Sequence, residues 1–190
     1  MQSLENKVIL ITGASSGIGR SLAMLAAKKG AKLALCGRTP AKMSSLMSDL
    51  SDCDADIVAE CFDITDEKQT VNFIKEAIQH FGHIDILINN AGANTQKDKI
   101  VDIKTSDYEY MIKLNQVAPF VVMREVFKDM QSRQDGRIIN ILSTVCLFSN
   151  PTLGSYTASK NAFDGMTKIF RKEAAEDGVA VTAVYPGGVN

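Results

Sequence analysis

Short segments of β type alternate with longer amphipathic segments along the chain, and this alternation limits the possible folds more than any other feature. The segments with strand character are residues 8–12, 32–36, 56–61, 84–88, 136–142 and 179–184. The segments with helical spacing are residues 17–29, 41–50, 67–81, 107–131 and 155–176. Strands joined through helices need crossover connections, so we expect a mostly parallel sheet that helices bury on both faces.

The number of strand–helix units separates an open sheet from a closed barrel. A (β/α)8 barrel needs eight units and typically ~250 residues, whereas this chain has 190 residues. We therefore predict an α/β fold with a doubly wound parallel sheet in three α/β/α layers. Neither a repeat nor a linker divides the sequence, so residues 1–190 are expected to form a single domain.

Three start signals support the helical segments. Thr39 and Pro40 fit a cap followed by a first-turn proline. The pairs Asp66 with Gln69 and Ser106 with Glu109 have the spacing of capping boxes. These signals predict where three of the helices begin.

Charge and apolar runs exclude several classes of partner. Lys plus Arg total 21 and Asp plus Glu total 22, a net charge of −1 that is too even to attract nucleic acid or an anionic membrane. Apolar stretches such as 21–27 and 117–123 are far shorter than the ~20 residues of a membrane helix. We expect a soluble cytoplasmic protein without nucleic-acid or membrane partners.

The cysteine and histidine residues indicate no metal site. The four cysteines form no CxxC pair, and Cys36 and Cys61 lie in strand-like runs where a thiol packs as a small apolar group. His80 and His83 follow a helical pattern without a neighbouring cysteine or acidic cluster, which is typical of histidines at a helix end. We therefore predict neither a bound metal nor a disulfide framework.

A glycine-rich loop separates the first predicted strand from the first helix. Such loops let backbone N–H groups approach a diphosphate at a helix N-terminus, although a glycine-rich turn can also bind nothing. The spacing differs from the G-x-G-x-x-G pattern. The candidate cofactor-binding residues of this loop are Gly13, Ser15, Ser16, Gly17, Ile18 and Gly19.

Arg38 follows the second predicted strand, where an acidic residue typically binds the ribose hydroxyls of NAD. A guanidinium group suits a 2′-phosphate, so Arg38 favours NADP, although an exposed arginine at the start of a loop is an alternative. Asp63 follows the third strand and could accept a hydrogen bond from the adenine amino group. It fits a plain loop carboxylate equally well.

Asparagines mark two further positions. Asn89, Asn90, Ala91 and Gly92 follow the fourth predicted strand, where small residues allow a cofactor to come close or simply form a turn. Asn115 lies within an apolar helical run, where a buried amide needs hydrogen-bond partners. It either stabilises the packing or serves a water relay.

Ser143, Tyr156 and Lys160 provide the candidate chemistry. Tyr156 and Lys160 are four residues apart on one helix and share a face, and Ser143 ends the fifth predicted strand. A nearby ammonium group favours the phenolate, which makes Tyr156 a better acid and base near neutrality. Ser143 could donate a hydrogen bond to a substrate oxygen that gathers negative charge as a hydride reaches the carbonyl carbon. Alone, the pair Tyr156 and Lys160 would fit a solvated surface pair.

Together these residues resemble the classical short-chain dehydrogenase/reductase family. The motifs occur in the family's order over essentially the whole chain, and Tyr156 follows Ser143 by 156 − 143 = 13 positions, as in the family. The resemblance implies a Rossmann-type NAD(P)-binding domain. It also implies an oxidoreductase that transfers a hydride between NADP(H) and a carbonyl or secondary alcohol, with a small-molecule substrate.

The resemblance also assigns roles to residues. Tyr156 would be the proton donor or acceptor, Lys160 would bind the nicotinamide ribose and lower the tyrosine pKa, and Ser143 would orient the substrate oxygen. Asn115 would help to hold a relay water. The remaining cofactor contacts implied by the family are Asp63 and Ile64 at the adenine, Asn90, Ala91 and Gly92 along the adenosine, and Pro186 and Gly187 at the nicotinamide.

The last residues depart from the family pattern. Residues 185–190 follow a strand and read as the start of a loop, whereas family members continue with another strand and helices. We therefore expect a domain that lacks its last strand and helices. This leaves a non-catalytic dinucleotide-binding or interaction protein, or a fragment of a longer reductase, as alternatives.

Two broad apolar helical faces, in 111–130 and 162–170, predict a homodimer or homotetramer unless these faces are buried within the domain itself.

Overall fold

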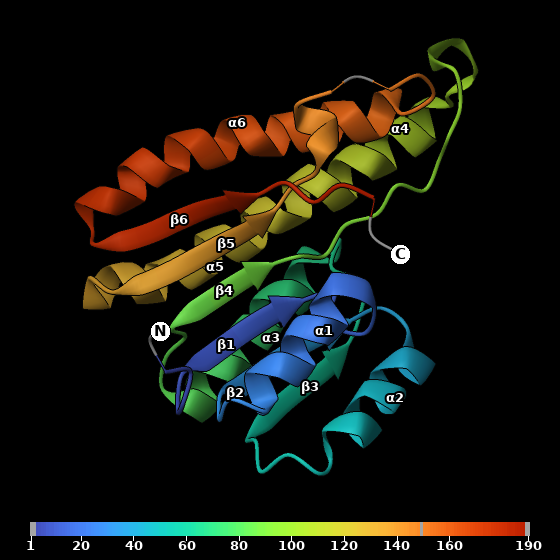
Figure 1. Cartoon of the computed structure of the whole chain (residues 1–190). Coiled ribbons are helices and arrows are strands. Elements are labelled where there is room, and N and C mark those ends of the chain that lie inside the picture. Colours follow the sequence, from blue (N-terminus) through green and yellow to red (C-terminus); the bar gives the residue numbers. More distant parts are fainter. Residues whose placement is uncertain (1–2, 149, 189–190) are drawn as a thin grey trace.

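The computed structural model describes residues 3–148 and 150–188, and its centre is a six-stranded parallel sheet. The strands are β1 (Val8–Thr12), β2 (Lys32–Gly37), β3 (Ile57–Cys61), β4 (Ile86–Asn89), β5 (Gly136–Ile141) and β6 (Val179–Val184). Their order, β3-β2-β1-β4-β5-β6, is that of the Rossmann fold. The predicted fold class is confirmed, and the direction of winding reverses between β1 and β4 (Figure 1).

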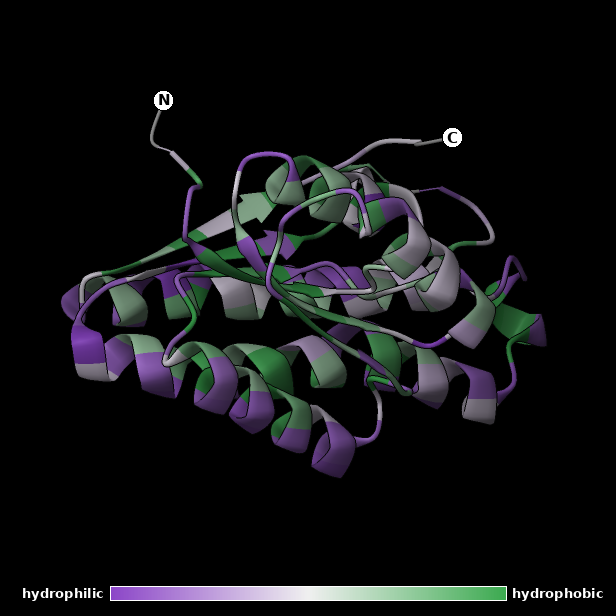
Figure 2. Cartoon of the chain, turned by 90° about the horizontal axis from the view of Figure 1, so that it is seen from below, coloured by the Kyte–Doolittle hydropathy of each residue, from purple (hydrophilic) through white to green (hydrophobic). Residues whose placement is uncertain are grey.

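Helices cover the sheet on both faces. They are α1 (Gly17–Ala27), α2 (Pro40–Leu50), α3 (Glu67–Phe81), α4 (Thr105–Ile112), α5 (Ala118–Arg133) and α6 (Gly154–Glu176). One apolar core joins the sheet to α3, α5 and α6, and a second joins it to α1 and α2. In Figure 2 hydrophilic residues gather on the outward turns of the helices. None of the helices in the described part of the chain is long and apolar enough to span a membrane.

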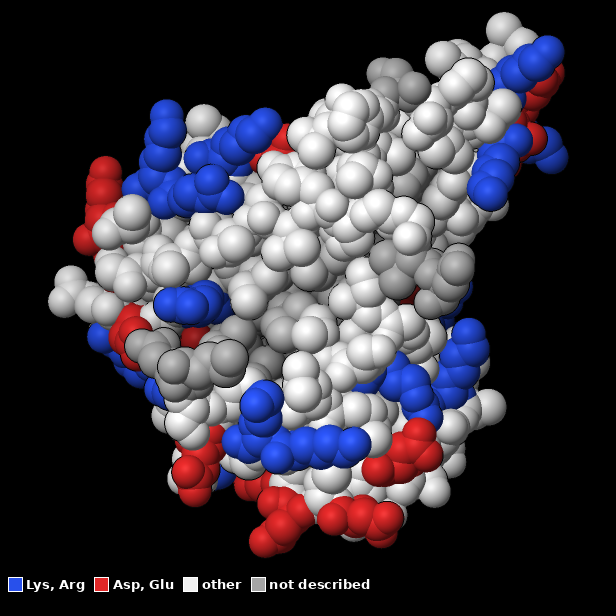
Figure 3. Space-filling view, in the orientation of Figure 1, with Lys and Arg blue, Asp and Glu red and all other residues white. Residues whose placement is uncertain are grey.

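Burial on both faces holds for the middle of the sheet and not for its margins. Every residue of β1 is buried, whereas β6 alternates and leaves Ala180, Thr182 and Val184 exposed on one face. Figure 3 shows few charged side chains over the middle of the face where β5 and β6 lie in Figure 1. The expectation of two buried faces was therefore wrong for β6. Cys61 on β3 is likewise exposed rather than packed, because β3 is the other edge strand.

The segment expected as one helix over 107–131 is two helices joined by a π-helical turn, η2 (Lys113–Val117). Pro119 in the first turn of α5 has no N–H to donate and its ring crowds the preceding turn, which accounts for the interrupted ladder. The capping box at Ser106 was wrong, because Lys104 is the N-cap of α4 and Ser106 lies inside the helix. The helix start at Asp66 is confirmed, with its carboxylate accepting from the Gln69 N–H at 3.0 Å. The reciprocal bond of a capping box is not made, because the Asp66 N–H donates to the Asp63 carbonyl at 2.9 Å and Gln69 Nε2 donates to the Asp66 carboxylate at 2.7 Å.

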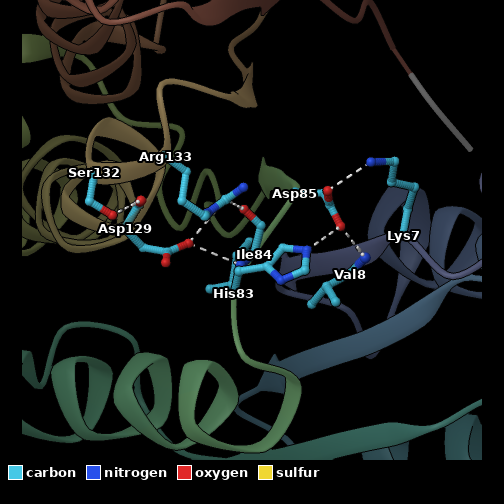
Figure 4. A network of polar contacts seen from close by, with 8 residues as sticks. All are labelled: Lys7, Val8, His83, Ile84, Asp85, Asp129, Ser132 and Arg133. Carbon is cyan, nitrogen blue, oxygen red and sulfur yellow. Dashed lines mark hydrogen bonds and ion pairs between the residues drawn. The ribbon is translucent and has the colours of Figure 1, made fainter.

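A polar network stabilises the edge of the sheet where the strands begin (Figure 4). Asp85 is 8% exposed and accepts hydrogen bonds from Lys7 Nζ at 2.8 Å, the Val8 N–H at 2.9 Å and His83 Nε2 at 3.1 Å. Burial raises the pKa of Asp85, but its bonds to Lys7 and Val8 and the charge of His83 outweigh this and the pKa is lowered. The ionised carboxylate therefore stabilises the fold.

Replacing Asp85 with asparagine should lower the free energy of unfolding at pH 7 by about 1–3 kcal/mol, because a buried charged acceptor is lost. Urea unfolding of both proteins measures this. A group with a lowered pKa contributes stability that is lost as the pH falls through its folded-state pKa, so the difference between the proteins should shrink in acid. The exposed Asp54→Asn variant is the control, and an equal effect of both variants would contradict the role of Asp85.

Candidate active site

A crevice of about 520 Å³ opens where the strands end, on both sides of the β1–β4 reversal point. This is the position and the size of small-molecule sites in doubly wound sheets. The sequence-predicted residues that line it are Gly13, Ser15, Ser16, Gly17, Ile18, Arg38, Asp63, Ile64, Asn90, Ala91, Gly92, Ser143, Tyr156, Lys160, Pro186 and Gly187. Gly19 and Asn115 do not line it and support it from behind.

The glycine loop fits the diphosphate of a dinucleotide because side chains would close the space. Gly13 has a φ of +64°, which favours glycine. A Cβ atom on Gly19 would lie 2.3 Å from the Gly13 carbonyl oxygen, so that helix α1 could not pack so close to the loop. Ser16 caps α1 without a side-chain hydrogen bond, which leaves the first N–H groups of the helix available to an anion.

Thr12 and Asn90 hold the loop after β1 against the loop after β4. The Thr12 hydroxyl accepts from the N–H groups of Asn90 at 3.0 Å and Ala91 at 2.9 Å. The Asn90 side chain donates to the carbonyls of Thr12 at 2.9 Å and Gly13 at 3.2 Å. These bonds fix both walls of the crevice at the point where the diphosphate would lie.

The other end of the crevice carries the groups expected to surround adenosine. Arg38 and Lys42 both line this end. Lys42 lies in the first turn of α2, and no sequence motif indicated it as a site residue. Asp63 also lines the crevice and accepts from the Thr65 N–H at 2.9 Å, so the carboxylate is a turn-forming group as well as a candidate adenine contact. Phe62 and Leu114 were missed too, because each belongs to an apolar run without a distinguishing pattern.

Lys160 is a buried ammonium group rather than part of a solvated surface pair. It is 3% exposed, and its Nζ donates to the carbonyl oxygen of Ile141 at 3.0 Å. Burial lowers the pKa of Lys160 from 10.5 to about 8. The surrounding protein thus disfavours the charged form, and an additional hydrogen-bond acceptor in the crevice would stabilise it.

Tyr156 does not show the lowered pKa expected from a neighbouring lysine. Burial raises the pKa of Tyr156, and an interaction with the Ser143 hydroxyl offsets only part of this. The reason is geometric, since the described contact of the Lys160 ammonium group is with Ile141, and desolvation disfavours the phenolate. Ser143 itself begins η3 (Thr144–Cys146), where its Oγ accepts from the Val145 N–H at 3.3 Å.

Asn115 lies in the π-helical turn and is fully buried. Its amide donates to the Ala93 carbonyl at 2.9 Å and accepts from the Ala93 N–H at 3.0 Å. A Cβ on Gly92 would lie 2.7 Å from Asn115 Oδ1 and 3.2 Å from Lys160 Nζ. Asn115 thus holds the loop after β4 beside the lysine, and its role in a water relay stays a prediction.

The loop after β6 reaches the same group of residues. The Thr144 N–H donates to the carbonyl of Pro186 at 2.9 Å, and the Tyr185 hydroxyl donates to Asp164 on α6 at 2.7 Å. Pro186 and Gly187 therefore lie beside the Ser143 segment. Residues 189–190, the end of the loop predicted over 185–190, lie outside the described residues.

Comparison with known proteins agrees with this geometry. The family model described as short chain dehydrogenase matches residues 7–190. The 3-oxoacyl-(acyl-carrier-protein) reductases FabG of Thermotoga maritima and Rickettsia prowazekii are 35% and 37% identical, over 97% and 98% of this chain and 74% of each relative. Solved structures of an NAD+-bound xylitol dehydrogenase and a levodione reductase each superpose with a TM-score of 0.93 at 26% identity. They cover 98% and 97% of this chain and 72% of each neighbour. The chain belongs to the short chain dehydrogenase family.

Proposed function

We propose that this NAD(P)-dependent oxidoreductase reduces a carbonyl group to a secondary alcohol, with NADPH as the preferred cofactor and Tyr156 as the proton donor. The observation that carries the proposal is the meeting of Tyr156, Lys160 and Ser143 in one crevice with a glycine cradle. The intact set of three also favours an enzyme over a non-catalytic binding protein.

The residues of the chain would divide the reaction between them. When bound, NADPH would supply the hydride for the carbonyl carbon. The Tyr156 hydroxyl gives its proton to the oxygen as charge develops there, and the Ser143 hydroxyl donates a hydrogen bond to the same oxygen. Lys160 would contact the nicotinamide ribose and, once held there, stabilise the Tyr156 phenolate that remains.

Arg38 and Lys42 support the preference for NADPH. Both cations line one end of the crevice, and guanidinium and ammonium groups are the usual partners of a phosphate. The sugar phosphate that distinguishes the two cofactors would then lie between them.

Two apolar residues that follow the Ser143 turn without lining the crevice favour an apolar substituent on the substrate. Leu147 and Phe148 follow the Ser143 segment and are 60% and 68% exposed. Apolar side chains that stay open beside a polar reaction centre are typical of a substrate wall.

A homodimer or homotetramer is a second proposal. Many apolar residues of the two expected faces are buried in the domain itself, among them Met111, Val122 and Met130. Val117 and Phe120 of the first face remain 39% and 36% exposed and Ile169 of the second face remains 57% exposed, so these side chains are available to a partner copy. The single-domain organisation of residues 1–190 and a cytoplasmic location, where NADPH is kept reduced, stay predictions.

Replacing Tyr156 with phenylalanine should reduce turnover of a ketone by about 100-fold or more, because the proton donor is removed. Cofactor affinity should change little, since the ring remains. Steady-state NADPH oxidation and cofactor titration measure the two quantities. Tyr108→Phe on the surface of α4 is the matched control. Undiminished turnover in the Tyr156 variant would contradict the mechanism.

Replacing Lys160 with methionine should abolish turnover and yet stabilise the fold by about 1–3 kcal/mol at pH 7, because a buried charge is removed. The folded-state pKa of about 8 lies below the ordinary lysine value of 10.5, so the stability of the wild-type protein rises between these pH values. The advantage of the variant should therefore disappear over that range in urea unfolding. Lys172→Met, exposed on α6, is the control.

Thermal unfolding with NADPH and with NADH tests the cofactor site. A ligand at ~100 times its dissociation constant stabilises a protein by about 2.7 kcal/mol. We expect NADPH to raise the unfolding temperature at concentrations where NADH does little. A larger effect of NADH would contradict the preference, and no effect of either would contradict a competent site in this chain.

A further inference from the structure

The side chain of Arg38 is held by a helix that lies far away in the sequence. Arg38 follows β2, and its Nη1 donates a hydrogen bond to the Tyr110 hydroxyl on α4 at 2.8 Å. Arg38 lines the crevice, and so does Leu114, four residues after Tyr110. Leu114 belongs to η2, which continues α4, so the hydrogen bond connects Arg38 at the crevice to the helix that leads into the η2 wall.

The partner of Arg38 is a hydroxyl group, whereas several other arginines pair with carboxylates. Arg20 contacts Asp49, Arg124 contacts Glu67 and Arg133 contacts Asp129. Within residues 3–148 and 150–188 no ion pair includes Arg38. A carboxylate would neutralise the guanidinium, but a tyrosine hydroxyl holds one of its five N–H groups and leaves the charge and the other donors available.

We propose that Tyr110 is a positioning residue that holds Arg38 at the adenosine end of the crevice and thereby sets the discrimination between NADPH and NADH. An exposed arginine has many rotamers, and binding a phosphate through it normally costs the ordering of the side chain. A hydrogen bond made before the ligand arrives removes part of that cost. The inference rests on the proposed preference for NADPH.

The effect of Tyr110 on cofactor affinity should depend on the 2′-phosphate alone. A phosphate can accept two parallel bonds from the guanidinium donors that Tyr110 leaves free. Lys42 lines the same end of the crevice, but its ammonium group is a point charge that does not need a fixed plane. NADH has no 2′-phosphate, so the orientation of Arg38 should matter little to its affinity.

Tyr110→Phe removes only the hydroxyl group and tests this directly. We expect its dissociation constants for NADPH and for 2′,5′-ADP to rise about 3- to 10-fold, as for one lost hydrogen bond. Those for NADH and 5′-ADP should stay unchanged. Calorimetric titration measures all four. Tyr108→Phe is the matched control, because Tyr108 lies on the same helix and is 41% exposed. It should change none of them.

The variant Arg38→Ala separates this inference from the proposed cofactor preference. It should remove most of the discrimination, and adding Tyr110→Phe to it should have no further effect. If Arg38→Ala leaves the discrimination intact, the preference for NADPH is not based on Arg38 and both proposals fail. Arg38→Ala can remove the discrimination while Tyr110→Phe leaves all four dissociation constants unchanged, raises them all equally or lowers that of NADPH. In each of these cases the positioning role of Tyr110 alone is wrong.

Discussion

The site depends on the contact between the loops that follow β1 and β4. The two strands are neighbours in the sheet but are separated by several crossover units, and the Thr12 hydroxyl and the Asn90 amide join their ends. Gly13 and Gly19 make room for this contact, because a Cβ on Gly19 would meet both the Gly13 carbonyl and the Asn90 amide. The crevice lies over this junction, so the same hydrogen bonds that join the two strand ends also hold its floor.

A charged side chain is buried at each end of the strands, and the two charges have opposite effects on stability. Where the strands begin, Asp85 is ionised, accepts several hydrogen bonds and stabilises the fold. Where they end, Lys160 is buried with a lowered pKa and a backbone carbonyl as its described partner. A charge held at a cost in stability is typical of a functional site, because the ligand rather than the protein supplies the remaining partners.

The segment pattern predicted the strands and helices closely, and strands 8–12 and 179–184 and the helix over 67–81 agree with the observed bounds. Strong periodicity and a cap at Asp66 made this possible. The region 107–131 failed because a π-helical turn needs only a local change in hydrogen bonding that apolar spacing does not record. Lys42, Phe62 and Leu114 were missed as residues that line the crevice, since none of them stands out until the fold brings them there.

The sequence by itself determined the sheet, its parallel direction and the edge at which the candidate residues collect, because periodicity and crossover connections decide these properties locally. The residues Ser143, Tyr156 and Lys160 could likewise be singled out from their positions after a predicted strand and on one helix face, and their roles from the family resemblance. Only the tertiary structure decided their chemical state, since burial and the partner of each group set the pKa values of Tyr156 and Lys160. It alone also placed Tyr110 against Arg38, a contact between distant segments that no sequence period encodes.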